Sequence, residues 1–233
     1  MAHMTGFQRA RSAEQREQRR QVILSTAESM LAELPVAEIS LNELSRRVGL
    51  AKSNVLRYFE SREAVLLALL DEAWKRWLDD LAVDLDKAID PAASVTQRCE
   101  QLAAVFAASL AARPQLCELS SASVAVLERN ISFDVALACK QSSAENLLRT
   151  VELVRAQIGE LSVEQATAFV GAAVVFAGAV WTHSRPPAVV EAVYVAHPEF
   201  AVMRLDFSVT LRETLATLLA GLLVRGLPHL DQG

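Results

Sequence analysis

Hydrogen-bonding side chains are crowded into the stretch VGLAKSNVLRYFES, residues 48–61. Lys and Arg donate to guanine O6 and N7, Asn pairs with adenine through two hydrogen bonds, and Ser and Tyr hydroxyls contact phosphates. The side chains of these types are Lys52, Ser53, Asn54, Arg57 and Tyr58. Their density indicates a surface that contacts nucleic acid. The alternative is a polar helix face that is only solvated.

The elements that must position these side chains are three short helices. Ala51, Val55 and Phe59 recur at i, i+4 and i+8, which predicts a helix to about residue 58 that packs on its neighbours. Ser40 and Glu43 form a predicted capping box at the start of a helix over 41–47, and Gly49 breaks that helix. A first helix is predicted over residues 12–34. Helix, tight turn and helix in this order form the helix-turn-helix pattern.

Basic residues surround the predicted contact face. Residues 1–62 carry ten Lys/Arg and seven Asp/Glu, whereas the rest of the chain carries 13 and 21. We therefore expect a polyanion partner for the first segment only. Arg9, Arg11, Arg16, Arg19 and Arg20 are interpreted as a flexible basic arm. The predicted DNA contacts are Ser40, Asn42, Lys52, Ser53, Asn54, Arg57, Tyr58, Arg62, Arg19 and Arg20.

Helical periodicity continues through the rest of the chain, so the predicted fold class is all-α, with about nine helices in total. The predicted domains are a three-helix helix-turn-helix domain with a basic N-terminal arm, residues 1–62, and a larger helical domain, residues 63–233. The later helices are expected over the ranges 61–90, 94–112, 115–129, 132–158, 162–184 and 205–225, with a less regular part at 186–204.

Other classes of function find little support in the sequence. Cys99, Cys117 and Cys139 are far apart and have no neighbouring His, so we expect reduced cysteines in a cytoplasmic protein, with no metal and no cofactor. No phosphate loop, nucleophile elbow or metalloprotease motif is present, so we expect no enzyme. The apolar run 166–181 is shorter than a membrane span and contains two glycines, so we expect a buried helix and no membrane partner.

The stretch GLAKSNVLRYFESREAVLLALL, residues 49–70, resembles the helix-turn-helix signature of the tetracycline-repressor (TetR/AcrR) family. Gly49, Val55, Tyr58, Phe59 and Ser61 fit the family pattern directly, and the resemblance covers residues of about 20–70. Departures also occur. Leu56 stands where the family usually has a tyrosine that touches the phosphate backbone, and Ala51 replaces a Ser or Thr.

The resemblance implies a homodimeric repressor that binds a palindromic operator and is released by a small, largely apolar effector. It also implies a ligand cavity among the fourth to eighth helices and a four-helix bundle between the copies. The candidate cavity linings are Trp74, Trp77, Phe106, Phe133, Phe176 and Trp181, for which plain core is the alternative. The candidate dimer residues are Phe169, Ala173, Val174, Ala177, Val180, Leu215, Leu218 and Leu222, for which the alternative is the core of a monomer.

A rival interpretation keeps the same fold and drops the DNA. In that case the chain is an all-helical protein-interaction module whose helix-turn-helix no longer binds DNA, and the missing tyrosine at Leu56 is the residue that favours it.

Overall fold

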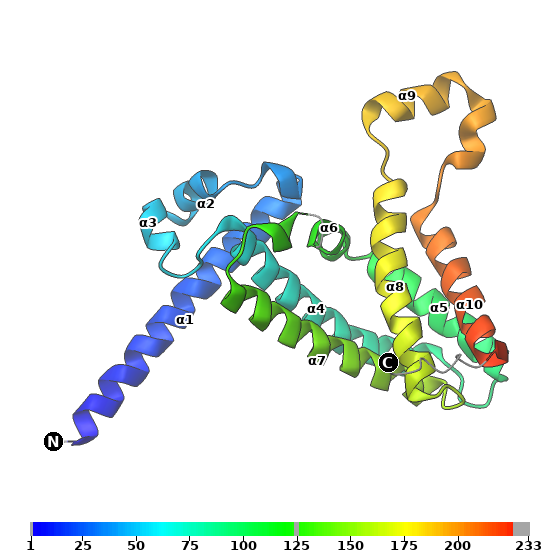
Figure 1. The fold of residues 1–233 in the computed structure, drawn as a ribbon, viewed down its shortest axis with the longest axis horizontal. Coiled ribbons are helices and arrows are strands. Elements are labelled where there is room, and N and C mark those ends of the chain that lie inside the picture. Colours follow the sequence, from blue (N-terminus) through cyan, green and yellow to red (C-terminus); the bar gives the residue numbers. More distant parts are fainter. Residues whose placement is uncertain (1, 124–125, 226–233) are drawn as a thin grey trace, which may run out of the picture. The chain divides into compact units, whose positions relative to one another are not determined.

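The computed structural model describes residues 2–123 and 126–225, and the side chains of residues 14–123 and 126–224. In these residues there are ten α-helices and three 3-10 helices, and no strand (Figure 1). The first part holds α1 (Ala2–Glu33), η1 (Val36–Glu38), α2 (Leu41–Val48), α3 (Lys52–Val55) and α4 (Arg62–Ala88). The second part holds α5 (Val95–Ala111), α6 (Pro114–Ser123), η2 (Leu127–Arg129), α7 (Phe133–Gln157), α8 (Val163–His183), α9 (Ala188–Ala196), η3 (Pro198–Met203) and α10 (Phe207–Arg225). The all-α prediction is confirmed.

Two compact units make up the chain. The first contains residues 1–71 and 122–139, and the second contains residues 72–121 and 140–233. The chain passes between the units within α4 and α7. The first unit therefore includes η2 and the start of α7, which the sequence pattern assigned to the larger domain. The predicted domain boundary at residues 62 and 63 falls at the first residues of α4 and stays a prediction.

The first unit has a core built from one face of each short helix. Ile23, Ala27 and Met30 of α1 are fully buried, as is Val55 of α3, and Leu44 of α2 is almost so. α2 packs on α1 and on α3. A four-residue helix is too short to be stable alone, so burial of its apolar side holds α3 in place.

The turn between α2 and α3 depends on Gly49. Its φ of 72° lies in the left-handed region, and its N–H bonds to carbonyls in the last turn of α2. At the other end of α2, the Ser40 hydroxyl accepts from the Glu43 N–H at 3.2 Å. The Glu43 carboxylate binds Arg46 and Arg47 instead of returning to Ser40, so half of the predicted capping box forms.

The second unit packs α10 against α5 and α8. α8 and α10 run antiparallel, because Gln165 Nε2 donates to the Leu222 carbonyl at 2.6 Å and the rings of Trp181 and Phe207 meet edge to face at 5.2 Å (Figure 1). Three elements differ from the expectations. α1 begins at Ala2, where a flexible arm was predicted. α6 ends at Ser123, before the predicted residue 129. The less regular part holds the additional helix α9.

Candidate nucleic-acid interface and apolar pocket

The outer side of α3 presents the predicted contact residues to solvent. Lys52, Ser53, Asn54 and Arg57 are exposed and Tyr58 is half-buried, while Val55 and Phe59 between them are buried. The chain keeps turning past the end of α3, since the N–H groups of Tyr58 and Phe59 both donate to the Val55 carbonyl. The structure therefore aims these polar groups away from the protein. Ala51, expected to pin the helix, is exposed and precedes it as the N-cap residue.

A notch between α1 and α3 brings basic residues from both helices together. It is lined by Gln15, Arg16, Arg19, Leu50, Asn54, Arg57 and Tyr58. Within the residues described, the side chains of Arg16, Arg19 and Arg57 make no hydrogen bond or ion pair, and no acidic residue lines the notch. Unpaired guanidinium groups that converge on one concave surface form a site for anionic oxygens, and phosphate is the anion that suits them best.

Two of the predicted DNA-contact arginines are used inside the unit instead. Arg62 donates to the Val36 carbonyl at 2.5 Å and lies 3.7 Å from Glu63. Arg20 lies over the Phe59 ring, 5.1 Å from its centre. Because each side chain folds back onto the core, neither reaches into the notch. Arg62 and Arg20 therefore hold the domain together, contrary to the prediction that they contact DNA.

The remaining predicted contacts lie at the start of α2 or beyond the described side chains. Ser40 and Asn42 are both exposed, and Ser40 caps α2. Neither lines the notch. The side chains of Arg9 and Arg11 lie outside the described residues. Arg16 and Gln15 were absent from the list of expected contacts, although the spacing of Arg16 and Arg19 places both on one side of a helix.

The first unit also carries an ion-pair cluster on the other side of α2. Glu43 accepts from Arg46 at 2.6 Å and from Arg47 at 2.9 Å, and Arg47 also reaches Glu33 at 2.8 Å. The hydrogen bonds from Arg46 and Arg47 lower the pKa of Glu43 to about 2. These two arginines are therefore neutralised by carboxylates, in contrast to the arginines of the notch.

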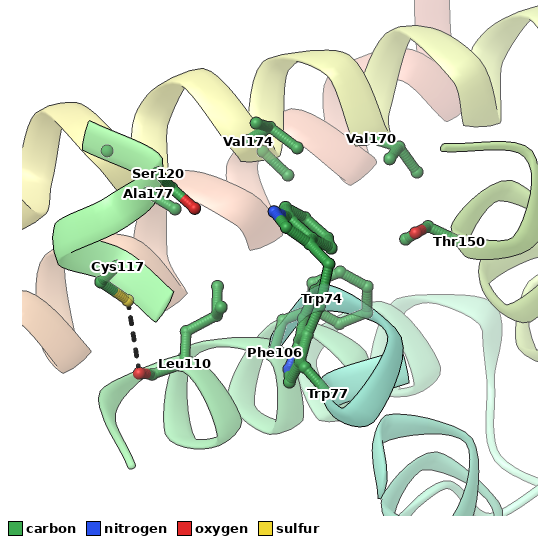
Figure 2. Close-up of a pocket in the computed structure, with 12 residues that line it drawn as sticks. Trp74, Trp77, Phe106, Leu110, Cys117, Ser120, Thr150, Val170, Val174 and Ala177 are labelled. Carbon is green, nitrogen blue, oxygen red and sulfur yellow. Dashed lines mark hydrogen bonds between the residues drawn. The ribbon is translucent and has the colours of Figure 1, made fainter. Parts of the chain in front are cut away.

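An apolar pocket lies in the second unit, enclosed by side chains from α4, α5, α6, α7 and α8 (Figure 2). It is lined by Trp74, Trp77, Phe106, Leu110, Cys117, Ser120, Thr150, Val170, Ala173, Val174, Ala177 and Gly178. The enclosed volume is about 20 Å³, close to the space of one water molecule. A larger ligand would therefore enter only if these side chains moved.

The polar atoms around the pocket are largely satisfied. Trp77 Nε1 donates to the Ser109 hydroxyl at 3.0 Å, and the Thr150 hydroxyl donates to the Asn146 carbonyl at 2.7 Å. The Cys117 thiol donates to the Leu110 carbonyl at 3.4 Å (Figure 2), and burial raises its pKa to about 12. The thiol is therefore protonated at neutral pH. No lining residue is charged, so the pocket suits an apolar, uncharged group.

The aromatic residues predicted to line a cavity divide into two groups. Trp74, Trp77 and Phe106 are in the pocket wall. Phe133 is 79% exposed at the start of α7 in the first unit, and Phe176 is exposed on α8. Trp181 is buried, but its Nε1 donates to Glu118 and Arg185 lies over its ring. The prediction is therefore not met at the last three positions, because helical periodicity does not tell which side of a helix faces a cavity.

The predicted dimer residues lie mostly on the inner side of α8 and α10. Ala173, Val174 and Ala177 line the pocket. Phe169, Val180 and Leu215 are buried within their own unit, and Leu218 and Leu222 are half-buried. As a prediction of a surface, this set was wrong for the buried positions, because α8 is apolar all round and its sequence does not distinguish inside from outside.

The outer sides of these two helices are also apolar. On α8 this side carries Gly171, Val175 and Ala179, and Val175 is 69% exposed. A Cβ at Gly171 of α8 or Gly221 of α10 would meet no atom within 4 Å. Both helices are long and apolar enough to cross a membrane, and only 28% of each apolar window is buried. The argument that this region is too short to span a membrane therefore fails, since α8 has 21 residues.

Comparison with known proteins gives two adjoining family matches. Residues 23–69 match the family described as "Bacterial regulatory proteins, tetR family", and residues 71–226 match "Tetracyclin repressor-like, C-terminal domain". The HTH-type transcriptional regulator EthR of Mycobacterium tuberculosis is 44% identical over 55 residues, which cover 24% of this chain and 26% of EthR. The match thus spans about a quarter of that relative's length.

Two solved structures share the fold over most of their length. A TetR transcriptional regulator from Rhodococcus sp. RHA1 has a TM-score of 0.56 at 15% identity, covering 90% of this chain and 97% of that one. The regulator FadR from Bacillus subtilis, in complex with stearoyl-CoA, has a TM-score of 0.51 at 14% identity, covering 89% and 99%. At such identities the likeness shows the fold alone.

Proposed function

Because this chain belongs to the tetR family of bacterial regulatory proteins, we propose that it is a cytoplasmic repressor that binds a palindromic operator as a homodimer. A small, neutral and largely apolar effector releases it. The observation that carries the proposal is the notch where Arg16 and Arg19 of α1 converge with Asn54 and Arg57 near α3. The proposal assigns the chain no reaction to catalyse.

On DNA, α3 and the residues that follow it enter a major groove. Ser53, Asn54 and Arg57 meet base edges there, and Lys52 and Tyr58 reach the groove walls. Arg16 and Arg19 bind the phosphates that border the same groove, because the notch opens toward the residues that read the bases. The position of Leu56, 40% exposed beside them, contributes apolar contact in place of a tyrosine hydroxyl.

The homodimer forms through the outer sides of α8 and α10. Exposed neutral side chains such as Val175 on α8 and Val209 on α10 cover these sides, and such a surface is stabilised when a second copy removes it from water. The glycines at 171 and 221 leave room for close approach of helices. A membrane is the other way to cover these helices; the family to which the chain belongs favours the dimer.

The effector binds in the pocket around Trp74 and Trp77 and opens it. The structural relative FadR binds stearoyl-CoA, whose phosphates carry negative charge. The pocket wall of this chain has no cationic residue to pair with them. A neutral apolar molecule that wedges apart α4 and α8 fits this lining better, and it must bind the low-affinity state of the dimer more tightly to release DNA.

The proposal is tested by fluorescence anisotropy with DNA from upstream of the chain's own gene. Wild-type protein should bind at least one duplex, with an affinity that falls steeply with salt. Arg57→Ala should weaken specific binding by about 10- to 100-fold, if the lost contact is worth about 1–3 kcal/mol. Arg149→Ala is the matched control, because Arg149 is paired with Asp79 in the second unit.

One rival function has a specific observation in its favour. A protein-interaction module without DNA binding is compatible with the exposed Leu56 at a position where a phosphate-contacting tyrosine is usual. In that case no genomic duplex would be retarded at low salt, and Arg57→Ala would behave like wild type. That result would exclude the repressor.

A further inference from the structure

The segment that joins α8 to α10, residues 188–203, has no buried side chain although most of its large residues are apolar. It forms α9 and η3. Its exposed large apolar side chains include Val195 and Val202, which are 72% and 87% exposed. The others are Val189, Val193, Phe200 and Met203. Single exposed apolar residues are common on proteins, but a contiguous group marks a surface that another molecule covers.

Polar and ring contacts hold this α9–η3 segment in shape. Arg204 forms an ion pair with Glu191, which ties the end of η3 to α9. His197 Nδ1 lies 3.0 Å from Glu199, and its ring lies 5.7 Å from that of Phe200. The segment therefore keeps its conformation without an apolar core of its own. Its one arginine is already paired with a carboxylate, so the segment has little to offer a nucleic acid.

The chain places this segment directly between the two helices of the proposed dimer face. It extends beyond the last turn of α8 and the first turn of α10 (Figure 1). The exposed sides of these two helices are also apolar and neutral in the neighbouring turns, with Val175 on α8 and Val209 on α10. The segment and the two helices thus present one kind of surface, and a molecule that covers the helices reaches the segment as well.

We propose that the α9–η3 segment packs against a second copy of this chain, so that each copy holds the end of the other's α8–α10 pair. The proposal rests on the homodimer proposed above and extends its contact surface beyond the four helices. In a two-fold dimer each segment contributes the same contacts, so its apolar side chains leave water twice per dimer. A second copy is the occupant that fits, because both surfaces are neutral and apolar.

The first test is a site-specific photo-crosslink in the purified full chain. A benzoylphenylalanine placed at Val202 should yield a covalent product of twice the chain's mass on irradiation. The same group at Val83, an exposed valine on α4, is the control and should yield much less of that product. Absence of a product of double mass from position 202 would overturn the proposal.

The second test measures the dimer dissociation constant by sedimentation. The double variant Val193→Asp/Val202→Asp should raise it by about tenfold or more, because burial of carboxylates opposes association. Both residues are exposed, so the fold should persist, as far-UV circular dichroism will check. Val83→Asp should leave the constant unchanged. An unchanged constant in the double variant would count against the proposal.

Val175→Asp separates this proposal from the homodimer on which it rests. If wild-type chains stay monomeric at all concentrations, the proposed homodimer itself fails. If the wild type is a dimer that Val175→Asp dissociates while the double variant stays intact, only the role of the α9–η3 segment fails.

Discussion

The backbone N–H of Ser132 donates to Oε1 of Glu60 at 2.6 Å. Glu60 follows the turns after α3, and Ser132 caps the start of α7, where its hydroxyl accepts from Val135. Both residues belong to the first unit. A residue beside the recognition segment is therefore bonded to the end of a helix that continues into the second unit. This contact is one route by which changes in α7 would alter the position of α3.

Removal of this contact should weaken DNA binding although Glu60 touches no DNA. Glu60→Ala leaves the turn after α3 less constrained, and we expect affinity to fall by about two- to tenfold. Loss of a negative charge alone would raise the affinity. Glu38→Ala is the control, since Glu38 is exposed on η1. Anisotropy titrations of both variants check this, and equal affinities would refute the role of Glu60.

Acid should destabilise the first unit partly through Glu43. The hydrogen bonds from Arg46 and Arg47 lower its pKa from 4.5 to about 2 in the folded chain. A lowered pKa means that the folded state favours the charged carboxylate. The stabilisation is thus complete above about pH 4.5 and disappears as the pH falls toward 2.

Glu43→Gln removes this titration. The difference in melting temperature between wild type and variant should be largest near neutral pH and should shrink between pH 4.5 and 2, as thermal unfolding at a series of pH values would show. High salt should reduce the difference, because the cluster is exposed. A difference that is independent of pH would contradict the assignment.

Arg62 should act on stability more than on DNA affinity. Its bond to the Val36 carbonyl links α4 to η1 in a partly buried setting. Arg62→Ala should lower the free energy of unfolding by about 1–3 kcal/mol, the range for a charged hydrogen bond. At a temperature where the variant is folded, its DNA affinity should stay within about threefold of wild type, whereas a phosphate contact would make it fall further and flatten the salt dependence.

The hydrogen bond between Trp77 Nε1 and Ser109 offers a test of the pocket wall. Ser109→Ala leaves a buried N–H without its acceptor, at a cost of about 1–3 kcal/mol. In a Trp77→Phe background the N–H is gone, so the same serine change should cost much less. Chemical denaturation of the two single variants and the double variant measures the coupling. Strict additivity would show that the bond contributes nothing.

The amino-acid sequence by itself determined the recognition segment. Val55 and Phe59 are apolar at a spacing of four residues, so they had to face the core, and Asn54 and Arg57 then had to face outward. Gly49 supplied the positive φ of the turn. These are local rules with one outcome, and for that reason the helix-turn-helix and the family to which it points were predictable.

Tertiary structure decided everything that depends on which neighbour a side chain meets. Arg19 and Arg20 are adjacent in the chain, yet one opens into the notch and the other lies on Phe59. α8 is apolar on every side, so only packing could show that Ala173 lines a pocket and Val175 faces outward. Periodicity reports how side chains are distributed around a helix axis; the rotation of that helix against its partners comes from contacts between segments far apart in sequence.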